Sequence, residues 1–484
     1  MKKTFRKIAA VLIAAVIVFG AGITTAFAAS VDEKQVTSNA AMLIDQYTGE
    51  VLYQKNQDEK IRPASTTKIM TAVVTLEKVE SGAISLDDVV TVGSEINTKS
   101  AKGSNIGLVV GDKLKLQELL YGLIMHSGND AALVIAKYVG GTVDDFVKLM
   151  NEKAQQLGMN GSHFANPHGM DDDDHYVTCA DMAKLAKYAT KFSLLKTIGS
   201  TTTHSIPLEG DGKVITLTNT NYLIYHDDKS KTTDYTYKYA TGLKTGQTPK
   251  AGSCLVATGE KDGQKLIALV YGDESKSGTK RWTIAKYLLQ FGFDNYVSLS
   301  MEELAEKCGN LIVTVPNAAS SDEGGGKLKC MPVVGDDEND KITLTTEQVE
   351  SGINAKITPA DGLTAPVNEG DVVGTVTISV GDKELFSGNL AATRSVYSAT
   401  QVDKGENSVV TTMSTIDLND TKVKIQFKDM WFWLLIPAAL IVFLIVRGFV
   451  VKGRRHRRRS MGRYGSTRRR GGYSYGRGRR RRRF

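Results

Sequence analysis

Along the first part of the chain, segments whose hydrophobic residues alternate, as in β-strands, are followed by segments whose hydrophobic residues recur every three to four positions, as in helices. AMLIDQYTGEVLYQ predicts a hairpin of two strands that turns at Thr48-Gly49. Apolar residues at helical spacing follow, strands return later, and a last helix is expected over 280–291. The other expected helices span 116–125, 131–139, 143–157 and 180–188, and the later strands span 253–258 and 265–271, joined by a turn at 261–263. Strands at both ends with helices between them predict one mixed α/β domain, residues 30–297.

From residue 298 to residue 395 the pattern changes to short alternating strands. They are expected at 311–315, 342–344 and 375–380. In the last of them Val376, Ile378 and Val380 point to one face and the residues between them to the other. This region is predicted to be a small β-rich domain. A Ser/Thr/Asn-rich stretch at 396–429 then predicts a stalk or linker.

The two ends of the chain have the composition of membrane-directing segments. Four basic residues precede an apolar run at 8–19, and Ala26-Phe27-Ala28 has the small-x-small pattern of a cleavage site, so residues 1–28 are predicted to be a signal peptide. Residues 430–446 carry no charge, and a transmembrane helix is predicted at 430–451. The Arg-rich tail, 452–484, marks the cytoplasmic side. We therefore expect a single-pass protein of the cell membrane whose catalytic domain is extracytoplasmic.

The net charge of +8 hides two regions of opposite sign. Residues 447–484 carry 17 Lys and Arg and no acid, and the first 29 residues carry 4 and no acid. The body between them has an excess of about 13 acidic residues. For the tail, contact with anionic lipid is favoured over nucleic acid.

The four cysteines include no CxxC pair and no metal-ligand spacing. Cys179 and Cys254 are expected to be buried and free, and a pairing of Cys308 with Cys330 is left open. Asp171 to Asp174, with His168 and His175 nearby, are interpreted as an exposed acidic loop rather than a metal site.

The segment PASTTKIM places a lysine three residues after a serine. Apolar spacing after it predicts a helix that begins near Thr66, so Ser65 and Lys68 would lie side by side at its first turn. An amine beside a hydroxyl can take its proton. Because such a pair also arises by chance, its weight depends on partners elsewhere in the chain.

Two further motifs supply such partners. MHSGNDAA places Ser127-Gly128-Asn129 in a turn between two helices, and GLKTGQT places Lys244-Thr245-Gly246 before the later strands. The order S-x-x-K, S-x-N, K-T-G resembles that of the serine penicillin-binding proteins and β-lactamases. With the flanks NPHGMDDDDHY, PKAGSCLVA and LLQFGF, residues 38–395 are similar to the D-alanyl-D-alanine carboxypeptidases, the low-molecular-weight penicillin-binding proteins. The resemblance implies a penicillin-binding-protein/β-lactamase-like transpeptidase fold of the α/β (α+β) class, with an antiparallel sheet flanked by helices and a small all-β C-terminal domain.

The resemblance also implies a catalytic set. Ser65 would be the nucleophile, and Lys68 its base, which must be neutral at the working pH. Burial and the neighbouring charge of Lys244 both favour the neutral amine. Ser127 would relay a proton to the leaving nitrogen of D-alanine.

The remaining residues would bind the substrate. Asn129 would hold the substrate amide and the Lys68 amine. Gly246 would let the edge strand approach the substrate backbone, and Thr245 and Lys244 would meet the terminal carboxylate. The resemblance implies an oxyanion hole from the backbone N–H groups of Ser65 and Gln247, and a basic residue of the last helix near the carboxylate. Arg281 is predicted in that place, with Lys280 as the alternative.

The expected substrate is a peptidoglycan stem peptide ending in D-Ala-D-Ala, with β-lactams as covalent inhibitors and no metal or other cofactor. A β-lactamase shares the motifs, but Gly128 stands where an acidic residue would be expected, and no Glu-containing loop for a deacylating water is recognisable. An inactive wall-binding scaffold is disfavoured by the intact Ser65, Lys68, Ser127 and Lys244.

Overall fold

The structure, a computed structural model, describes residues 30–98, 103–210, 212–225, 234–275, 277–335 and 340–400. All of them belong to one unit of the chain, Met1–Gly405. The predicted signal peptide, transmembrane helix and Arg-rich tail lie outside the described residues, as does the stalk beyond residue 400. Within the described ranges, no helix combines the length and the apolar character needed to cross a membrane.

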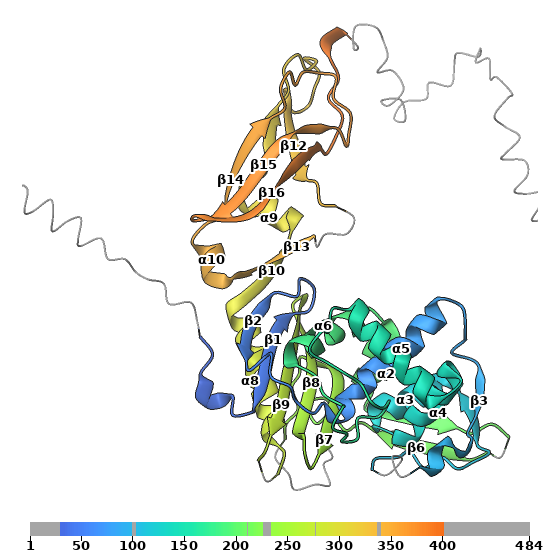
Figure 1. Cartoon of the computed structure of the whole chain (residues 1–484). Helices are drawn as coiled ribbons and strands as arrows, with labels where there is room; N and C mark the ends of the chain where they lie inside the picture. Colours follow the sequence, from blue (N-terminus) through green and yellow to red (C-terminus); the bar gives the residue numbers. More distant parts are fainter. Residues whose placement is uncertain are drawn as a thin grey trace, which may run out of the picture. The chain divides into compact units, whose positions relative to one another are not determined.

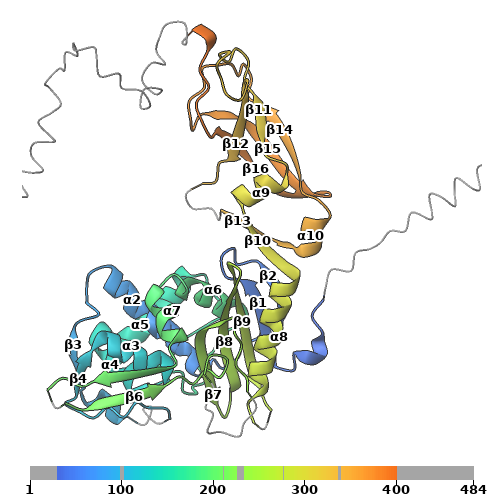
Figure 2. The same ribbon diagram turned by 180° about the vertical axis from the view of Figure 1, so that it is seen from behind.

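A five-stranded antiparallel sheet forms the centre of the first domain (Figures 1 and 2). Its order is β2-β1-β9-β8-β7, so β1 near the start of the domain pairs with β9 near its end, and β7 lies at an edge. Successive residues of β9 enter different apolar clusters: Ile267 and Leu269 enter one, and Leu266 and Ala268 enter the other. The sheet is therefore covered on both faces. Its strands are β1 (Ala40–Asp45), β2 (Val51–Lys55), β7 (Ala240–Thr248), β8 (Gly252–Lys261) and β9 (Gln264–Asp273).

Helices pack on both faces of this sheet. The long helix α8 (Lys280–Asn295) lies on one face, where Trp282 and Leu288 join the cluster that includes Leu255. On the other face the apolar cluster continues into α2, α6 and the helices packed around them. These helices are α2 (Lys68–Glu80), α3 (Leu116–Met125), α4 (Asn129–Gly140), α5 (Val143–Gln156), α6 (Cys179–Ala189) and α7 (Ser193–Ser200).

Short elements complete the first domain. The 3₁₀ helices are η1 (Glu33–Gln35), η2 (Ala64–Thr67) and η3 (Ser94–Asn97). β3 (Val89–Thr91) pairs with β4 (Lys113–Lys115), and β5 (Thr203–Pro207) pairs with β6 (Val214–Thr218). The turn η2, which leads directly into α2, lies against the edge strand β7, and the functional site is built there.

The second region contains a five-stranded antiparallel sheet of order β11-β12-β16-β15-β14. Val376 and Ile378 of β15 are buried in its apolar cluster, which confirms the predicted alternation. Its strands are β11 (Ile312–Thr314), β12 (Lys327–Pro332), β14 (Asn354–Pro359), β15 (Val372–Val380) and β16 (Lys383–Ala392). A separate ladder joins β10 (Tyr296–Ser300) to β13 (Lys341–Thr345), with the short helices α9 (Met301–Lys307) and α10 (Thr346–Glu350) after them.

Most predicted elements are confirmed, including the hairpin at Thr48-Gly49 and the last helix. One expectation changes: the helix expected to begin near Thr66 begins at Lys68, because the preceding residues form a 3₁₀ turn. The helix α7 and the short ladders β3–β4 and β5–β6 were not predicted. All four cysteines are free thiols, so Cys308 and Cys330 are not paired, and Cys179 and Cys254 are buried as expected.

Candidate active site

The turn that carries Ser65 is fixed by its own threonines. Thr66 Oγ1 donates a hydrogen bond to the carbonyl of Pro63 (2.7 Å), and Thr67 Oγ1 donates to that of Ala64 (2.8 Å). Ala64 has a φ of +48°, a conformation that is uncommon for a residue with a side chain. This conformation is held by packing, since Ala64 is buried. The turn presents Ser65 at the mouth of a cleft, one helical turn before Lys68.

Lys68 is fully buried and lies among three oxygen atoms. Its Nζ is 3.0 Å from Ser65 Oγ, 2.7 Å from Asn129 Oδ1 and 2.7 Å from the backbone carbonyl oxygen of His168. The last two oxygens can only accept hydrogen bonds. A neutral amine has two N–H groups for them, which leaves its lone pair directed at the hydroxyl of Ser65.

Electrostatics favour that neutral form. Burial, and then the positive charge of Lys244, lower the pKa of Lys68 well below that of an ordinary lysine, while the carboxylate of Asp130 acts in the opposite direction. Burial, and then Arg281, lower the pKa of Lys244 to about 7. The site therefore holds two buried lysines whose pKa values are both lowered, and a neutral Lys68 amine could serve as a base.

Ser127 and Asn129 come from the connection between α3 and α4. Ser127 has a φ of +64° and is 6% exposed, and Asn129 is the first residue of α4. A non-glycine residue with this φ costs free energy and persists only where the surrounding structure imposes it. In this conformation Ser127 lines the cleft that also contains Ser65.

The edge strand β7 forms the opposite wall. Lys244 is 1% exposed and its Nζ donates to the carbonyl oxygen of Thr245 (2.9 Å). A Cβ added to Gly246 would lie 3.1 Å from the backbone nitrogen of Ser65 and 3.1 Å from the carbonyl oxygen of Pro63. Gly246 therefore permits close approach of β7 to the turn that carries Ser65, in addition to the role expected for it toward substrate.

Arg281, at the start of α8, reaches the same wall. Its guanidinium donates from Nη1 to the carbonyl oxygen of Gly246 (2.9 Å) and lies over the ring of Trp282, with Cζ 4.5 Å from the ring centroid. Its backbone N–H donates to Asp273 Oδ2 (2.9 Å). Arg281 lines the cleft whereas Lys280 does not, so the structure favours Arg281 of the two candidates.

These elements enclose an open cleft with a volume of about 260 Å³. The structure brings all nine predicted site residues to it: seven line the cleft, while the amines of Lys68 and Lys244 are buried beside it. The described lining comprises Ser65, Gly103, Ser104, Ser127, Asn129, Met170, Thr220, Thr245, Gly246, Gln247, Thr248 and Arg281.

Comparison with known proteins identifies the family. The family model for D-alanyl-D-alanine carboxypeptidase matches residues 26–275, and the model for the penicillin-binding protein 5 C-terminal domain matches residues 324–398. The chain belongs to the D-alanyl-D-alanine carboxypeptidase family. This membership confirms the expected enzyme class, a hydrolase, and the resemblance on which the prediction rested.

Curated relatives are similar over most of their length. The chain is 31% identical to D-alanyl-D-alanine carboxypeptidase DacF of Bacillus subtilis, over 73% of this chain and 85% of that protein. It is 30% identical to DacC of Escherichia coli, over 75% of this chain and 85% of that protein.

Two solved structures extend the match to the fold. Penicillin-binding protein 5 of Haemophilus influenzae is 28% identical, with a TM-score of 0.56 over 76% of this chain and 100% of that chain. Penicillin-binding protein 6B of Escherichia coli is 26% identical, with a TM-score of 0.57 over 75% and 97%. The penicillin-binding carboxypeptidase fold with a C-terminal β domain is therefore confirmed.

The sequence did not indicate several groups that support this carboxypeptidase site. The carbonyl of His168 binds Lys68, and Thr220 Oγ1 lies 2.8 Å from Thr245 Oγ1. The buried carboxylate of Asp130 accepts hydrogen bonds from the backbone N–H groups of residues 106, 107, 108 and 131. It thereby fixes the chain that carries Gly103 and Ser104 into the cleft. Its position directly after Ser127-Gly128-Asn129 is the one sequence signal that could have indicated it.

The acidic loop is exposed at Asp172, Asp173 and Asp174, as expected. His168 and His175 are buried, and His175 Nε2 is 2.8 Å from Thr67 Oγ1, so this imidazole supports the turn that carries Ser65. No group of three or more potential metal ligands occurs within the described ranges.

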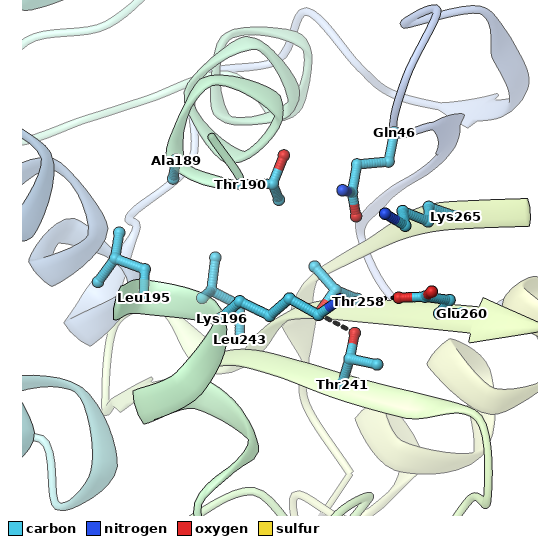
Figure 3. Close-up of a pocket in the computed structure, with 10 residues that line it drawn as sticks. All are labelled: Gln46, Ala189, Thr190, Leu195, Lys196, Thr241, Leu243, Thr258, Glu260 and Lys265. Carbon is cyan, nitrogen blue, oxygen red and sulfur yellow. Dashed lines mark hydrogen bonds and ion pairs between the residues drawn. The ribbon is translucent and has the colours of Figure 1, made fainter. Parts of the chain in front are cut away.

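A smaller pocket lies apart from the cleft (Figure 3). It is lined from α7, the end of α6 and the central sheet, with a volume of about 60 Å³. Lys196 Nζ bonds Glu260 Oε2 (2.9 Å), and Thr241 Oγ1 donates to Thr258 Oγ1 (2.9 Å). None of the nine predicted site residues is in its described lining, and four of its polar side chains form two bonded pairs, so we assign it no chemistry.

Proposed function

We propose that this chain is a serine-type D-Ala-D-Ala carboxypeptidase that removes the terminal D-alanine from peptidoglycan stem pentapeptides through an acyl-enzyme on Ser65. The activity would limit cross-linking, because a stem without its terminal D-alanine cannot act as a donor in D-Ala-D-Ala-dependent cross-linking. The observation that carries the proposal is the placement of the Lys68 amine, which lies 3.0 Å from Ser65 Oγ and 2.7 Å from each of two oxygens that can only accept hydrogen bonds, so that a neutral amine would direct its lone pair at Ser65.

In the first step Lys68 takes the proton of Ser65 as Oγ attacks the carbonyl carbon of the penultimate D-alanine. Negative charge then develops on the carbonyl oxygen, and the backbone N–H groups of Ser65 and Gln247 would stabilise it. Collapse of the intermediate breaks the C–N bond. The leaving nitrogen takes a proton through Ser127, which lines the cleft beside the nucleophile.

Substrate binding follows from the edge position of β7. An extended peptide can pair with the free edge of this strand as an added strand. Thr245, Lys244 and Arg281 then supply a hydroxyl and two cationic groups for the terminal carboxylate, and Asn129 holds the substrate amide. In the second step water replaces the leaving amine and releases the shortened peptide from Ser65.

β-Lactams would react at the same serine, because their strained amide carbonyl takes the place of the scissile bond and the leaving nitrogen stays tethered. The test is incubation of the full-length protein with a peptide ending in D-Ala-D-Ala and, separately, with benzylpenicillin. Release of D-alanine together with a lasting penicilloyl adduct supports the proposal. Rapid penicillin hydrolysis without an adduct and without D-alanine would indicate a β-lactamase instead.

We also propose that the enzyme is exported and anchored by one membrane span, with its catalytic domain outside and its tail in the cytoplasm. The support is the composition of residues 1–28, 430–451 and 452–484. Protease added to intact cells should digest the catalytic domain and spare an epitope on the tail. Digestion of the tail epitope with the catalytic domain spared would indicate the opposite orientation in the membrane.

A further inference from the structure

A hairpin outside the cleft is tied to the helix that leads to Ser127. The strands β5 and β6 form this hairpin, which lies beside α3 (Figures 1 and 2). His204 of β5 places Nε2 2.6 Å from Glu118 Oε2 in the first turn of α3. The imidazole is stacked on the ring of Tyr121, one helical turn later, with centroids 3.7 Å apart and an interplanar angle of 12°. We call this contact of His204 with Glu118 and Tyr121 the clasp.

The clasp is shielded from water and has a defined direction. The side chains of His204 and Glu118 are 24% and 14% exposed, and Tyr121 is buried. Because an ionised carboxylate can only accept hydrogen bonds, Nε2 carries the proton of this bond. Ile206 and Leu217 also anchor the hairpin in the apolar core, but apolar contacts have no preferred direction. The clasp therefore adds the directional contact that fixes the hairpin along α3.

The hairpin and α3 meet a second time at the wall of the cleft. Thr220, two residues after β6, donates its backbone N–H to the carbonyl oxygen of Met125, the last residue of α3 (3.1 Å). The hydroxyl of Thr220 lies 3.2 Å from the same carbonyl oxygen and 2.8 Å from Thr245 Oγ1 on β7. Ser127 follows Met125 by two residues. The position of Ser127 relative to β7 therefore depends on how the hairpin and α3 are held together.

We propose that His204 is a positioning residue for the transfer of a proton to the leaving amine, and that it acts through the clasp. The inference rests on the proposed function, in which Ser127 delivers that proton. Without the clasp the hairpin shifts along α3, and the shift reaches Ser127 through the contact of Thr220 with Met125. The turn η2 and the helix α2, which carry the proposed nucleophile and base, lie outside this path. Loss of the clasp should therefore slow the departure of the amine more than the attack on the carbonyl.

The choice of leaving group separates these two steps. An amide nitrogen must gain a proton before its bond to carbon breaks, whereas a thiolate leaves without one because a thiol is far more acidic than an amine. Two donors with the same acyl part, one ending in D-Ala-D-Ala and the other in a D-alanyl thioester of thioglycolate, therefore report turnover with and without the proton transfer. Both leaving groups end in a carboxylate, so the contacts proposed for the terminal carboxylate are available to both. The quantity compared is kcat/KM, which reports formation of the acyl-enzyme.

The deciding variant is His204→Phe in the full-length protein, because phenylalanine keeps a ring against Tyr121 and removes the N–H that is bonded to Glu118. It should lower kcat/KM for the peptide about tenfold, part of the roughly 10²–10⁴-fold that a positioned proton donor supplies, and change kcat/KM for the thioester less than about twofold. His204→Gln keeps an N–H donor at this place and should restore most of the activity on the peptide. Lys196→Ala is the matched control, because it breaks an ion pair between α7 and β8 (2.9 Å) and should leave the ratio of the two activities unchanged.

A purely structural role for His204 gives a different pattern. An equal loss with both donors, no loss with either, or a His204→Gln protein as slow on the peptide as His204→Phe would overturn the inference. Thermal unfolding shows whether each variant is folded, and if His204→Phe is not, Glu118→Ala removes the acceptor instead and should show the same selective loss. Absence of D-alanine release by the wild type would defeat the proposed function itself, whereas failure of the inference appears only in the variants.

Discussion

Gly246→Ala tests whether the width of the cleft depends on the missing side chain of β7. The new Cβ would lie 3.1 Å from Ala64 Cβ, from the carbonyl oxygen of Pro63 and from the backbone nitrogen of Ser65. Ordinary van der Waals contact begins at 3.4 Å. Two of the three atoms are backbone, which cannot rotate away, so β7 and the turn must separate by at least about 0.3 Å.

This separation has a cost in stability and in rate. Overpacking of this kind costs about 1–3 kcal/mol in the free energy of unfolding. A reacting group misplaced by about 1 Å loses roughly 10²-fold in rate, so a shift of about 0.3 Å predicts a loss of roughly fourfold in acylation. The assays are the second-order rate constant for acylation by benzylpenicillin and the thermal unfolding midpoint.

Gly199→Ala is the matched control. Gly199 lies in α7, and its new Cβ would be 3.4 Å from Leu243 Cδ1, an ordinary contact with a side chain of the same strand β7. Because alanine also favours the helix by up to about 1 kcal/mol, this variant should keep or gain stability and acylate normally. Equal acylation by Gly246→Ala and Gly199→Ala would refute the argument that β7 must approach Ser65 closely.

Three further predictions concern the base and its surroundings. Lys68→Ala should lower acylation about 10²–10⁴-fold with little change in the affinity of non-covalent substrate binding, and an unchanged acylation rate would exclude Lys68 as the base. Lys244→Ala removes a positive charge that lowers the pKa of Lys68. The base works only when deprotonated, so the acid limb of the pH profile of acylation should move to higher pH in this variant, and a limb that stays or moves lower would contradict the coupling. Asp130→Ala leaves four backbone N–H groups without their acceptor. This variant should lose at least about 2 kcal/mol of unfolding free energy and acylate more slowly. Wild-type values for both quantities would show that the carboxylate does not position the segment that carries Gly103 and Ser104.

The part of the site that could be predicted from sequence is the part that depends on local geometry. Ser65 and Lys68 are three residues apart where a 3₁₀ turn leads into α2, and a spacing of three places two side chains on one face in either kind of helix, so their contact follows from the spacing alone. The hairpin β1–β2 and the helix α3 follow equally from turn residues and apolar periodicity. The helix expected from Thr66 was displaced because Thr66 and Thr67 bond to backbone carbonyls and stabilise a 3₁₀ turn instead.

The other parts of the site could not be predicted from the sequence. They depend on contacts between distant segments or on backbone groups, and neither of these is indicated by the types of residue in the sequence. The acceptor for one N–H of Lys68 is the carbonyl of His168, which any residue could supply. The choice between Lys280 and Arg281 depends on which side of α8 faces β7, and adjacent helical positions differ in direction by about 100°. Thr220 lies far from the motifs in sequence and meets Thr245 only through the fold.

The central claim is that Ser65 carries the acyl group, activated by the neutral amine of Lys68. The most direct measurement is peptide mapping by mass spectrometry of the full-length protein after brief exposure to benzylpenicillin, for the wild type and for Ser65→Ala. The account predicts one penicilloyl group on the peptide that contains Ser65 in the wild type, and none on Ser65→Ala protein with an unchanged unfolding midpoint. An adduct on any other residue, or labelling that persists in folded Ser65→Ala, would contradict it.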